Sequence, residues 1–157
     1  MKITLVSIGK TDQDYLKEGL SIYQKRLKHY VNFEIRELAS LKKTSGMPVD
    51  TLKQKEAEVL RKSLEKTDFL VLLDEKGTHL TSEEFAGFLQ KRMNAGTREL
   101  SFVVGGAWGF DASLQQSADY KLSLSSMTFS HQMVRLFFCE QLYRAFTIIR
   151  GESYHNE

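Results

Sequence analysis

The segment Gly105–Gly109 (GGAWG) follows a short apolar run and is the first place where the sequence could hold a ligand. Glycines at 105 and 106 would let the backbone approach a ligand without intervening side chains, and Gly109 would allow a positive φ angle. The same spacing is also typical of an ordinary tight turn, because GGxxG is much less specific than a complete dinucleotide-binding motif. The motifs GxGxxG after the first predicted strand and GxxxxGK[ST] are absent from the sequence. Trp108 could stack on a base or be a partly buried structural residue.

The second candidate segment is LSSMTF, in which apolar side chains alternate with small hydroxyl groups. This composition suits an adenine edge that is read by backbone groups and enclosed by leucine and methionine side chains. The alternative is a strand end followed by a helix cap. Asp74–Gly77 has the composition of a polar turn, so near it only Leu73 is expected to contact a ligand, through its backbone.

The chain has four histidines and one cysteine, and their spacing does not match a zinc site. Cys139 lies in an apolar helical stretch and is expected in the core. Tyr154 and His155 come only a few residues after that stretch. They are either held near a pocket or part of a frayed terminus.

The composition predicts one cytoplasmic domain over residues 1–157, with no membrane segment. A length of 157 residues suits a single core, and a lone cysteine fits a reducing compartment. The first residues read as a strand rather than as a signal peptide. Met133–Ile149 is strongly apolar, but Arg135, Glu140 and Arg144 interrupt it, which favours a buried helix over a membrane span.

Short apolar runs alternate with amphipathic segments along the whole chain. We therefore expect an α/β fold with a mostly parallel sheet flanked by helices, and ligands beyond the carboxyl ends of the strands. A capping box of Thr81 and Glu84 predicts a helix that ends at Gly96. Asp50 and Ser130 are expected to cap two other helices, and Ala39–Val49 is expected to be a mobile loop. The predicted strands are 2–8, 33–38, 68–73, 100–104 and 120–124, and the predicted helices cover about 15–27, 50–64, 81–96 and 130–149.

The last predicted helix carries apolar residues on more than one face. One face would fill the core, and the remainder needs another cover. A two-fold related copy of the same surface is the commonest solution, so we predict a homodimer through the C-terminal helix.

Three segments together resemble one known family: GGAWGF, LSLSSMTFSHQMVRLFFCEQLYRAF and the terminal SYHNE. They are similar to the SPOUT-class methyltransferases and most closely to the RlmH family, and the resemblance extends over the whole chain. It implies a transfer of a methyl group from S-adenosylmethionine to N3 of a pseudouridine in 23S ribosomal RNA. It also implies a C-terminal trefoil knot and a dimer that buries the last helix. No metal is expected, because the spacing of the histidines does not match a metal site.

By position, the resemblance implies which residues contact the acceptor nucleotide and which contact the cofactor. The acceptor would be served by Arg144 and by the C-terminal tail, that is, Tyr154 and His155. His155 would be the base, Arg144 its electrostatic partner, and Tyr154 would stack on or hydrogen-bond the nucleotide. The sequence departs from the family pattern at Ala107 and Gln132, where proline is common, and at Asn156, where arginine is common. The implied cofactor contacts are Leu73, Gly105, Leu124, Ser125, Ser126, Met127, Thr128 and Phe129.

The small net charge of the chain indicates in which form it binds RNA. A balance of 22 basic against 20 acidic residues favours docking on an assembled ribosome over binding of naked RNA. Basic clusters at 25–28, 42–43 and 61–62 could contact phosphate or simply form solvated faces. The alternative function is a non-catalytic dimeric nucleotide-binding module with a regulatory role. A flavodoxin-like flavin or phosphate binder is disfavoured by the late glycine loop.

Overall fold

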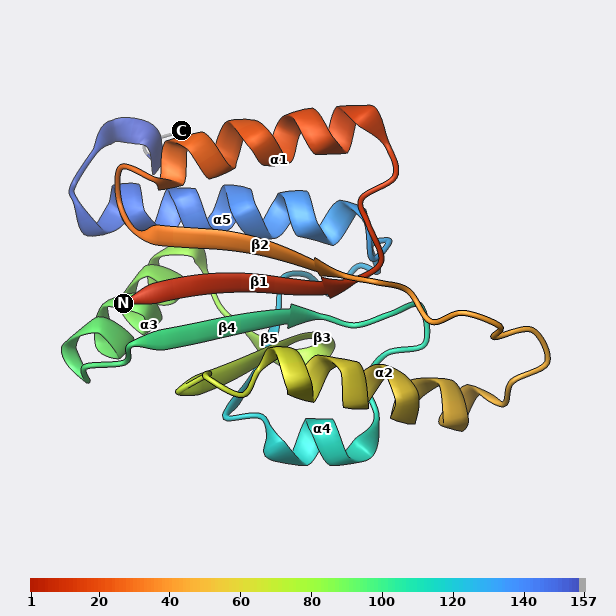
Figure 1. Cartoon of the computed structure of the whole chain (residues 1–157). Coiled ribbons are helices and arrows are strands. Elements are labelled where there is room, and N and C mark those ends of the chain that lie inside the picture. The colour runs from red at the N-terminus through yellow and green to blue at the C-terminus, as the bar shows by residue number, and fades with distance from the viewer. Residues whose placement is uncertain (156–157) are drawn as a thin grey trace.

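The computed structural model describes residues 1–155 as a parallel sheet covered by helices on both faces (Figure 1). Within these residues the sheet has five strands in the order β2-β1-β4-β3-β5, and each neighbouring pair is parallel. The predicted α/β class is thereby confirmed. The elements are β1 (Lys2–Ile8), α1 (Asp14–Leu27), β2 (Asn32–Leu38), α2 (Val49–Ser63), β3 (Phe69–His79), α3 (Ser82–Asn94), β4 (Glu99–Val104), α4 (Ala112–Ser117), β5 (Tyr120–Ser123), α5 (Met133–Ile149) and the 3-10 turn η1 (Ser153–His155).

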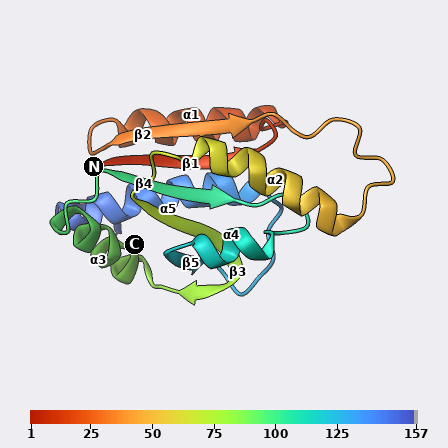
Figure 2. The same ribbon diagram turned by 60° about the horizontal axis from the view of Figure 1, so that its bottom comes forward.

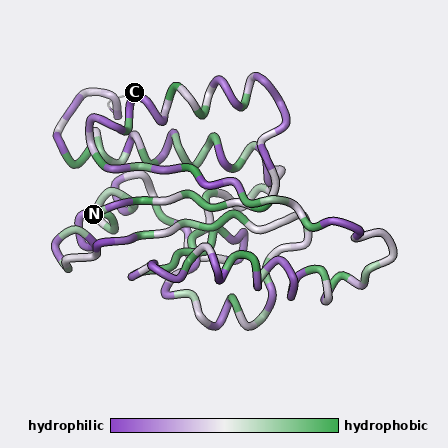
Figure 3. The backbone as a smooth tube through the Cα atoms, viewed as in Figure 1, coloured by the Kyte–Doolittle hydropathy of each residue, from purple (hydrophilic) through white to green (hydrophobic). Residues whose placement is uncertain are grey.

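Two hydrophobic cores form because successive strand residues point to opposite faces of the sheet. Ile3 and Leu5 of β1 belong to the core shared with α1, α3 and α5, whereas Val6 and Ile8 belong to the core under α2 and α4. Figure 2 shows α2 and α4 in front of the sheet and α5 behind it. The central strands therefore carry long hydrophobic stretches, as Figure 3 shows, while α1 and α2 contain many hydrophilic residues.

Helix α3 begins and ends as its sequence predicts. The Glu84 amide donates to Thr81 Oγ1 at 3.1 Å, and the Thr81 amide donates to Glu84 Oε2 at 2.7 Å, which completes the capping box. Gly96 adopts a φ of 76° just after the helix. The two reciprocal bonds satisfy amides that would otherwise lack a partner in the first turn.

One prediction about helices was wrong, and one helix was missed. Asp50 does not cap α2, because the helix already begins at Val49 after Pro48, and Asp50 lies inside the first turn, where its charge suits the helix dipole. Helix α4 was not expected at all. Its N-cap Asp111 accepts a bond from the Ser113 amide at 3.0 Å, but six residues are too few to show a helical period.

The stretch Asp74–Gly77 is not a turn between elements, as its composition indicated, but part of β3. Both Leu73 and Thr78 pair with Leu122 of β5, so the residues between them bulge out of the ladder. A Cβ atom on Gly77 would lie 2.7 Å from the carbonyl carbon of Lys121 and 2.8 Å from backbone atoms of Leu122. The bulge therefore needs glycine at position 77 because the backbone of β5 passes so close.

Gly77→Ala should lower the free energy of unfolding by roughly 1–3 kcal/mol, because β3 and β5 must separate to admit the methyl group. Gly87→Ala is the matched control: Gly87 is exposed on α3 with open space around its Cα, so the same substitution should raise stability by up to about 1 kcal/mol. Urea unfolding of both variants measures the difference. Equal stability of the two variants would contradict the close approach at Gly77.

Candidate functional site

A cavity of about 780 Å³ lies beyond the carboxyl ends of β3, β4 and β5. Its walls are the bulge of β3, the glycine loop after β4, the segment after β5 and the first turn of α5. These are the strand-end positions at which a parallel sheet of this kind accepts ligands. Seven of the eight residues expected to contact a cofactor line it: Leu73, Gly105, Leu124, Ser125, Met127, Thr128 and Phe129. Ser126 is exposed and is not among the lining residues.

The glycine loop is both a tight turn and a wall of this cavity. Gly109 has a φ of 80°, and its amide donates to the Gly106 carbonyl at 3.1 Å. A Cβ on Gly105 would lie 3.2 Å from the Phe110 ring, and one on Gly106 would lie 2.7 Å from the Glu56 carboxylate. Trp108 is 61% exposed and lines the cavity, so it is not the partly buried structural residue that was one of its two interpretations.

The hydroxyl groups of the segment after β5 hold the segment in shape. Ser123 Oγ donates to the Ser125 carbonyl, and Ser125 Oγ accepts from the Met127 amide, both at 2.9 Å. Thr128 Oγ1 donates to Glu75 Oε2 of the β3 bulge at 3.2 Å. Since these side chains are engaged within the protein, recognition of a ligand falls to backbone groups and to apolar side chains such as that of Met127, which is 74% exposed.

Ser130 is not the N-cap of α5, as was expected, because the helix begins later and its N-cap is Gln132, but the Ser130 hydroxyl still binds the first residue of the helix. Ser130 Oγ accepts from the Met133 amide at 3.1 Å, and the Ser130 carbonyl accepts from the Val134 amide at the same distance. Helix α5 itself begins at Met133. These two bonds tie the end of the cavity wall to the first turn of α5.

The three residues expected to serve the acceptor lie together at the other end of α5. The Arg144 guanidinium lies 4.7 Å from the centre of the Tyr154 ring and donates to the Tyr154 carbonyl at 3.4 Å. It also lies 3.5 Å from His155 Nδ1 and forms an ion pair with Glu140 at 2.8 Å. Glu83 of α3 completes the group, with Oε1 2.7 Å from His155 Nε2.

Sequence reasoning missed Glu140 and Glu83. Glu140 stands four residues before Arg144, and ion pairs at this spacing are common on helices, so a signal for it was present. Glu83 lies 72 residues from His155, and no local pattern connects the two. The contact exists only because α3 and α5 pack side by side.

The neighbours of the Tyr154 hydroxyl and of the Glu83 carboxylate shift the pKa values of these two groups. Burial, then the hydrogen bond to Tyr23 and the charge of Glu140, raise the pKa of the Tyr154 hydroxyl. This hydroxyl therefore keeps its proton and donates to Glu140 Oε1 at 3.2 Å. The hydrogen bond with His155 lowers the pKa of Glu83. An ionised Glu83 accepts from Nε2–H of His155, which turns the Nδ1 lone pair toward Arg144.

The cavity and the tail do not meet within one chain. Val134 lines the cavity, and Arg144 lies ten residues further along α5, which is about 15 Å at the rise of an α-helix. In Figure 1 the strands point toward the start of α5, whereas the tail lies at the opposite end of this helix. None of Arg144, Tyr154 and His155 lines the cavity.

The remaining sequence predictions concern Cys139, metal binding, membrane spans and Asn156. Cys139 is fully buried, as expected, and burial raises its pKa. Within residues 1–155 no group of three histidine, cysteine, aspartate or glutamate side chains could hold a metal ion. In the same range, none of the helices combines the length and the apolar character needed to cross a bilayer. Asn156 lies outside the described residues.

Comparison with known proteins assigns the family. The model of the family described as "Predicted SPOUT methyltransferase" matches residues 1–155. The chain is 51% identical to "Ribosomal RNA large subunit methyltransferase H" of Christiangramia forsetii over 156 residues, which is 99% of each chain. It is 47% identical to the protein of the same name from Parabacteroides distasonis over 100% of each chain.

Solved structures agree on the fold. A probable methyltransferase from Bordetella pertussis superposes with a TM-score of 0.57 at 11% identity, covering 92% of this chain and 96% of that chain. A probable methylase family protein from Haemophilus influenzae gives 0.52 at 10% identity, covering 95% and 66%. From the match over residues 1–155 and relatives at about half identity over their full length, we conclude that the chain belongs to the SPOUT methyltransferase family, in the group of the large subunit methyltransferases H.

Proposed function

We propose that the chain is an S-adenosylmethionine-dependent methyltransferase that methylates N3 of a pseudouridine in 23S ribosomal RNA, on the assembled ribosome. The observation that carries the proposal is the cavity at the carboxyl ends of β3, β4 and β5, lined by seven of the eight residues expected to hold the cofactor. The relatives from Christiangramia forsetii and Parabacteroides distasonis, both named as methyltransferases of large subunit ribosomal RNA, support the choice of substrate.

The residues of the cavity fit the proposed cofactor. Its volume lies in the range of ordinary ligand sites, and Gly105 contributes backbone without a side chain. Leu124, Met127 and Phe129 provide apolar surface for an adenine ring. S-adenosylmethionine, when bound, supplies a methyl group on a positively charged sulfur. The task of the protein is to position this donor, and positioning can contribute roughly 7–11 kcal/mol to a reaction.

The acceptor side requires a group that takes a proton from the imide nitrogen. Tyr154 does not serve as the base, because its raised pKa keeps the hydroxyl protonated and able to donate a hydrogen bond. His155 serves as the base through Nδ1, the ring nitrogen that carries the lone pair, once this atom leaves Arg144, while Nε2–H stays bonded to Glu83. Arg144 stabilises the negative charge that develops on the carbonyl oxygens of the nucleotide.

A homodimer through α5 reconciles the two halves of the site. The cavity and the tail are separated by the length of α5 in one chain, and a two-fold related copy places the tail of one protomer against the cavity of its partner. Apolar side chains remain exposed near the start of α5, where Phe129 and Phe137 are each 39% exposed with ring centres 4.8 Å apart. Such a patch suits a two-fold interface.

Isothermal calorimetry should detect binding of S-adenosylmethionine to the wild-type protein and a loss of affinity of at least about tenfold in Gly105→Val, whose side chain meets Phe110 and narrows the cavity. Gly87→Ala is the control and should bind like the wild type. Unchanged affinity in Gly105→Val, with the fold retained, would place the cofactor elsewhere.

His155→Ala should reduce methyl transfer by about a hundredfold or more while cofactor affinity stays unchanged, because it removes the base but no cavity wall. The measurement is incorporation of a tritiated methyl group into ribosomes from a strain that lacks the modification. His29→Ala is the control, because His29 is an exposed histidine just after α1 whose backbone carbonyl accepts a bond from Arg150 at the end of α5. Ligand binding without any turnover by the wild type would favour the non-catalytic regulatory module.

Mixing two inactive variants tests whether the site is shared between protomers. A heterodimer of Gly105→Val and His155→Ala combines one intact cavity with the intact tail of the other chain, so mixing should restore part of the activity. No recovery on mixing, with heterodimers demonstrated by mass spectrometry, would mean that each chain uses its own tail.

Phe137→Glu should yield monomers by light scattering, with cofactor binding retained and turnover lost.

A further inference from the structure

Arg135 is a fully buried cation in the first turn of α5, and none of the chemistry described so far uses it. Its three side-chain nitrogens are all engaged. Nη2 donates to the Ile8 carbonyl and Nη1 to the Gly9 carbonyl, both at 3.0 Å, where β1 ends. Nε donates to the His131 carbonyl at 3.1 Å. One side chain thus joins the exit of β1 to the last residue of the cavity wall before α5.

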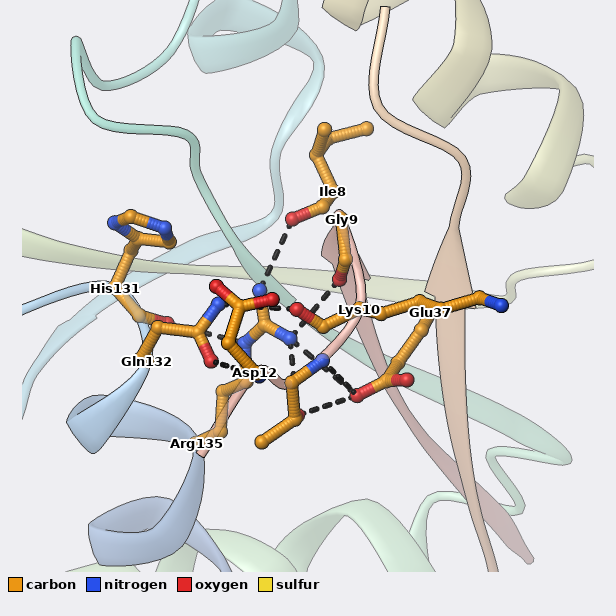
Figure 4. Close-up of polar contacts among 9 residues, drawn as sticks. Ile8, Gly9, Lys10, Asp12, Glu37, His131, Gln132 and Arg135 are labelled. Carbon is orange, nitrogen blue, oxygen red and sulfur yellow. Dashed lines mark hydrogen bonds and ion pairs between the residues drawn. The ribbon is translucent and has the colours of Figure 1, made fainter. Parts of the chain in front are cut away.

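A carboxylate from β2 completes this arrangement. Glu37 Oε1 lies 3.4 Å from Arg135 Nη1 and accepts a hydrogen bond from the Thr11 amide at 2.9 Å and another from the Thr11 hydroxyl. Thr11 Oγ1 also lies 3.1 Å from Arg135 Nη1. Figure 4 shows the guanidinium at the centre of these groups, which come from β1, β2 and the start of α5.

Gln132 forms a second connection between the same two segments. Its Oε1 accepts from the Asp12 amide, and its Nε2 donates to the Lys10 carbonyl, both at 3.1 Å. The amide side chain therefore pairs with the backbone of the loop after β1 in both directions, as Figure 4 also shows. We refer to Arg135, Gln132, Glu37 and Thr11 as the Arg135 cluster.

The position of the cluster matters because residues 124–131 form one wall of the cavity but belong to no helix or strand. The wall is attached to the end of β5 by a bond from the Ser123 hydroxyl to the Ser125 carbonyl, and to the β3 bulge by a bond from the Thr128 hydroxyl to the Glu75 carboxylate. At its far end, the Arg135 cluster supplies the attachment to β1 and β2. A wall without regular structure keeps its shape only where such attachments exist.

Stability alone is a weak reason for a buried guanidinium. Removing this charge from water costs several kcal/mol, and a buried ion pair often gives no net stabilisation relative to apolar residues. The gain from the cluster is geometric, because a planar guanidinium with several fixed donors can hold three backbone carbonyls in one relative position.

We propose that Arg135 is a positioning residue that, with Gln132 and Glu37, fixes residues 124–131 against the end of β1 and so sets the affinity of the cavity for its ligand. The identity of this ligand, S-adenosylmethionine, rests on the proposed function. The claim that the Arg135 cluster fixes the position of residues 124–131 is independent of which ligand binds.

Two variants test the proposal. Arg135→Lys keeps the charge, but a single ammonium cannot reach the Ile8, Gly9 and His131 carbonyls together. Gln132→Ala removes the second connection and leaves the buried guanidinium in place, which guards against loss of the fold. Arg36→Lys is the matched control, since Arg36 holds the Ser63 carbonyl at 2.8 Å near the end of α2, away from the cavity.

Arg135→Lys should raise the Kd for S-adenosylmethionine at least about tenfold, since small misplacements of a site can cost as much as a hundredfold. Gln132→Ala should give a smaller increase. In both, amide hydrogen exchange in residues 124–131 should accelerate more than in the rest of the chain, whereas Arg36→Lys should lower Tm without changing Kd or exchange in this wall.

Two results would overturn the proposal: a Kd within twofold of wild type in both cluster variants, or uniform acceleration of exchange across the chain, as expected for a merely structural residue. If the wild type does not bind S-adenosylmethionine, the proposed function fails. Hydrogen exchange in residues 124–131 then still decides whether the Arg135 cluster fixes the wall.

Discussion

Parallel pairing of β3 with β4 on one side and with β5 on the other brings three strand ends together that are far apart in the sequence. Since parallel strands all point the same way, the residues after Leu73, Val104 and Ser123 meet at one edge of the sheet. The bulge of β3 extends this edge. Leu73 and Thr78 pair with the same residue of β5, and the residues between them project to the cavity, where Glu75 meets Thr128. The shape of the cavity thus follows from how the strands pair.

Close backbone contacts explain why small residues surround this edge. A Cβ atom on Gly77 would lie 2.7 Å from the backbone of β5, and one on Gly105 would lie 3.2 Å from the Phe110 ring. A Cβ atom on Gly106 would lie 2.7 Å from the Glu56 carboxylate of α2, whose pKa is raised by burial. Packing against backbone therefore requires glycine at position 77, whereas a side chain at 105 or 106 would have to displace the Phe110 ring or the Glu56 carboxylate.

The sequence predicted the buried parts of the fold well because their signals are local. The β1 run and the capping box of α3 are contained in a few neighbouring residues, and both were placed correctly. The β3 bulge was mistaken for a turn, because polar composition indicates exposure but cannot reveal pairing with β5. Likewise, the candidate cofactor residues gather in one cavity, whereas the separation of the tail from it depends on the length and direction of α5, which only the fold specifies.

The three charges that interrupt the apolar sequence of α5 differ in their surroundings. Glu140 and Arg144 form a helical pair at the usual spacing, and each remains about a fifth exposed. Arg135 has no such exposure, and a cation in the first turn of a helix opposes the helix dipole, which favours negative charge there. Desolvation lowers its pKa, whereas Glu37 and Asp12 act in the opposite direction. Both burial and the dipole thus work against a cation at this position.

The carbonyl groups of Ile8, Gly9 and His131 offset that cost, and they do so only when the exit of β1 and the start of α5 keep the relative position seen in the structure. The charge therefore makes the folded state depend on that position more strongly than an apolar side chain in its place could.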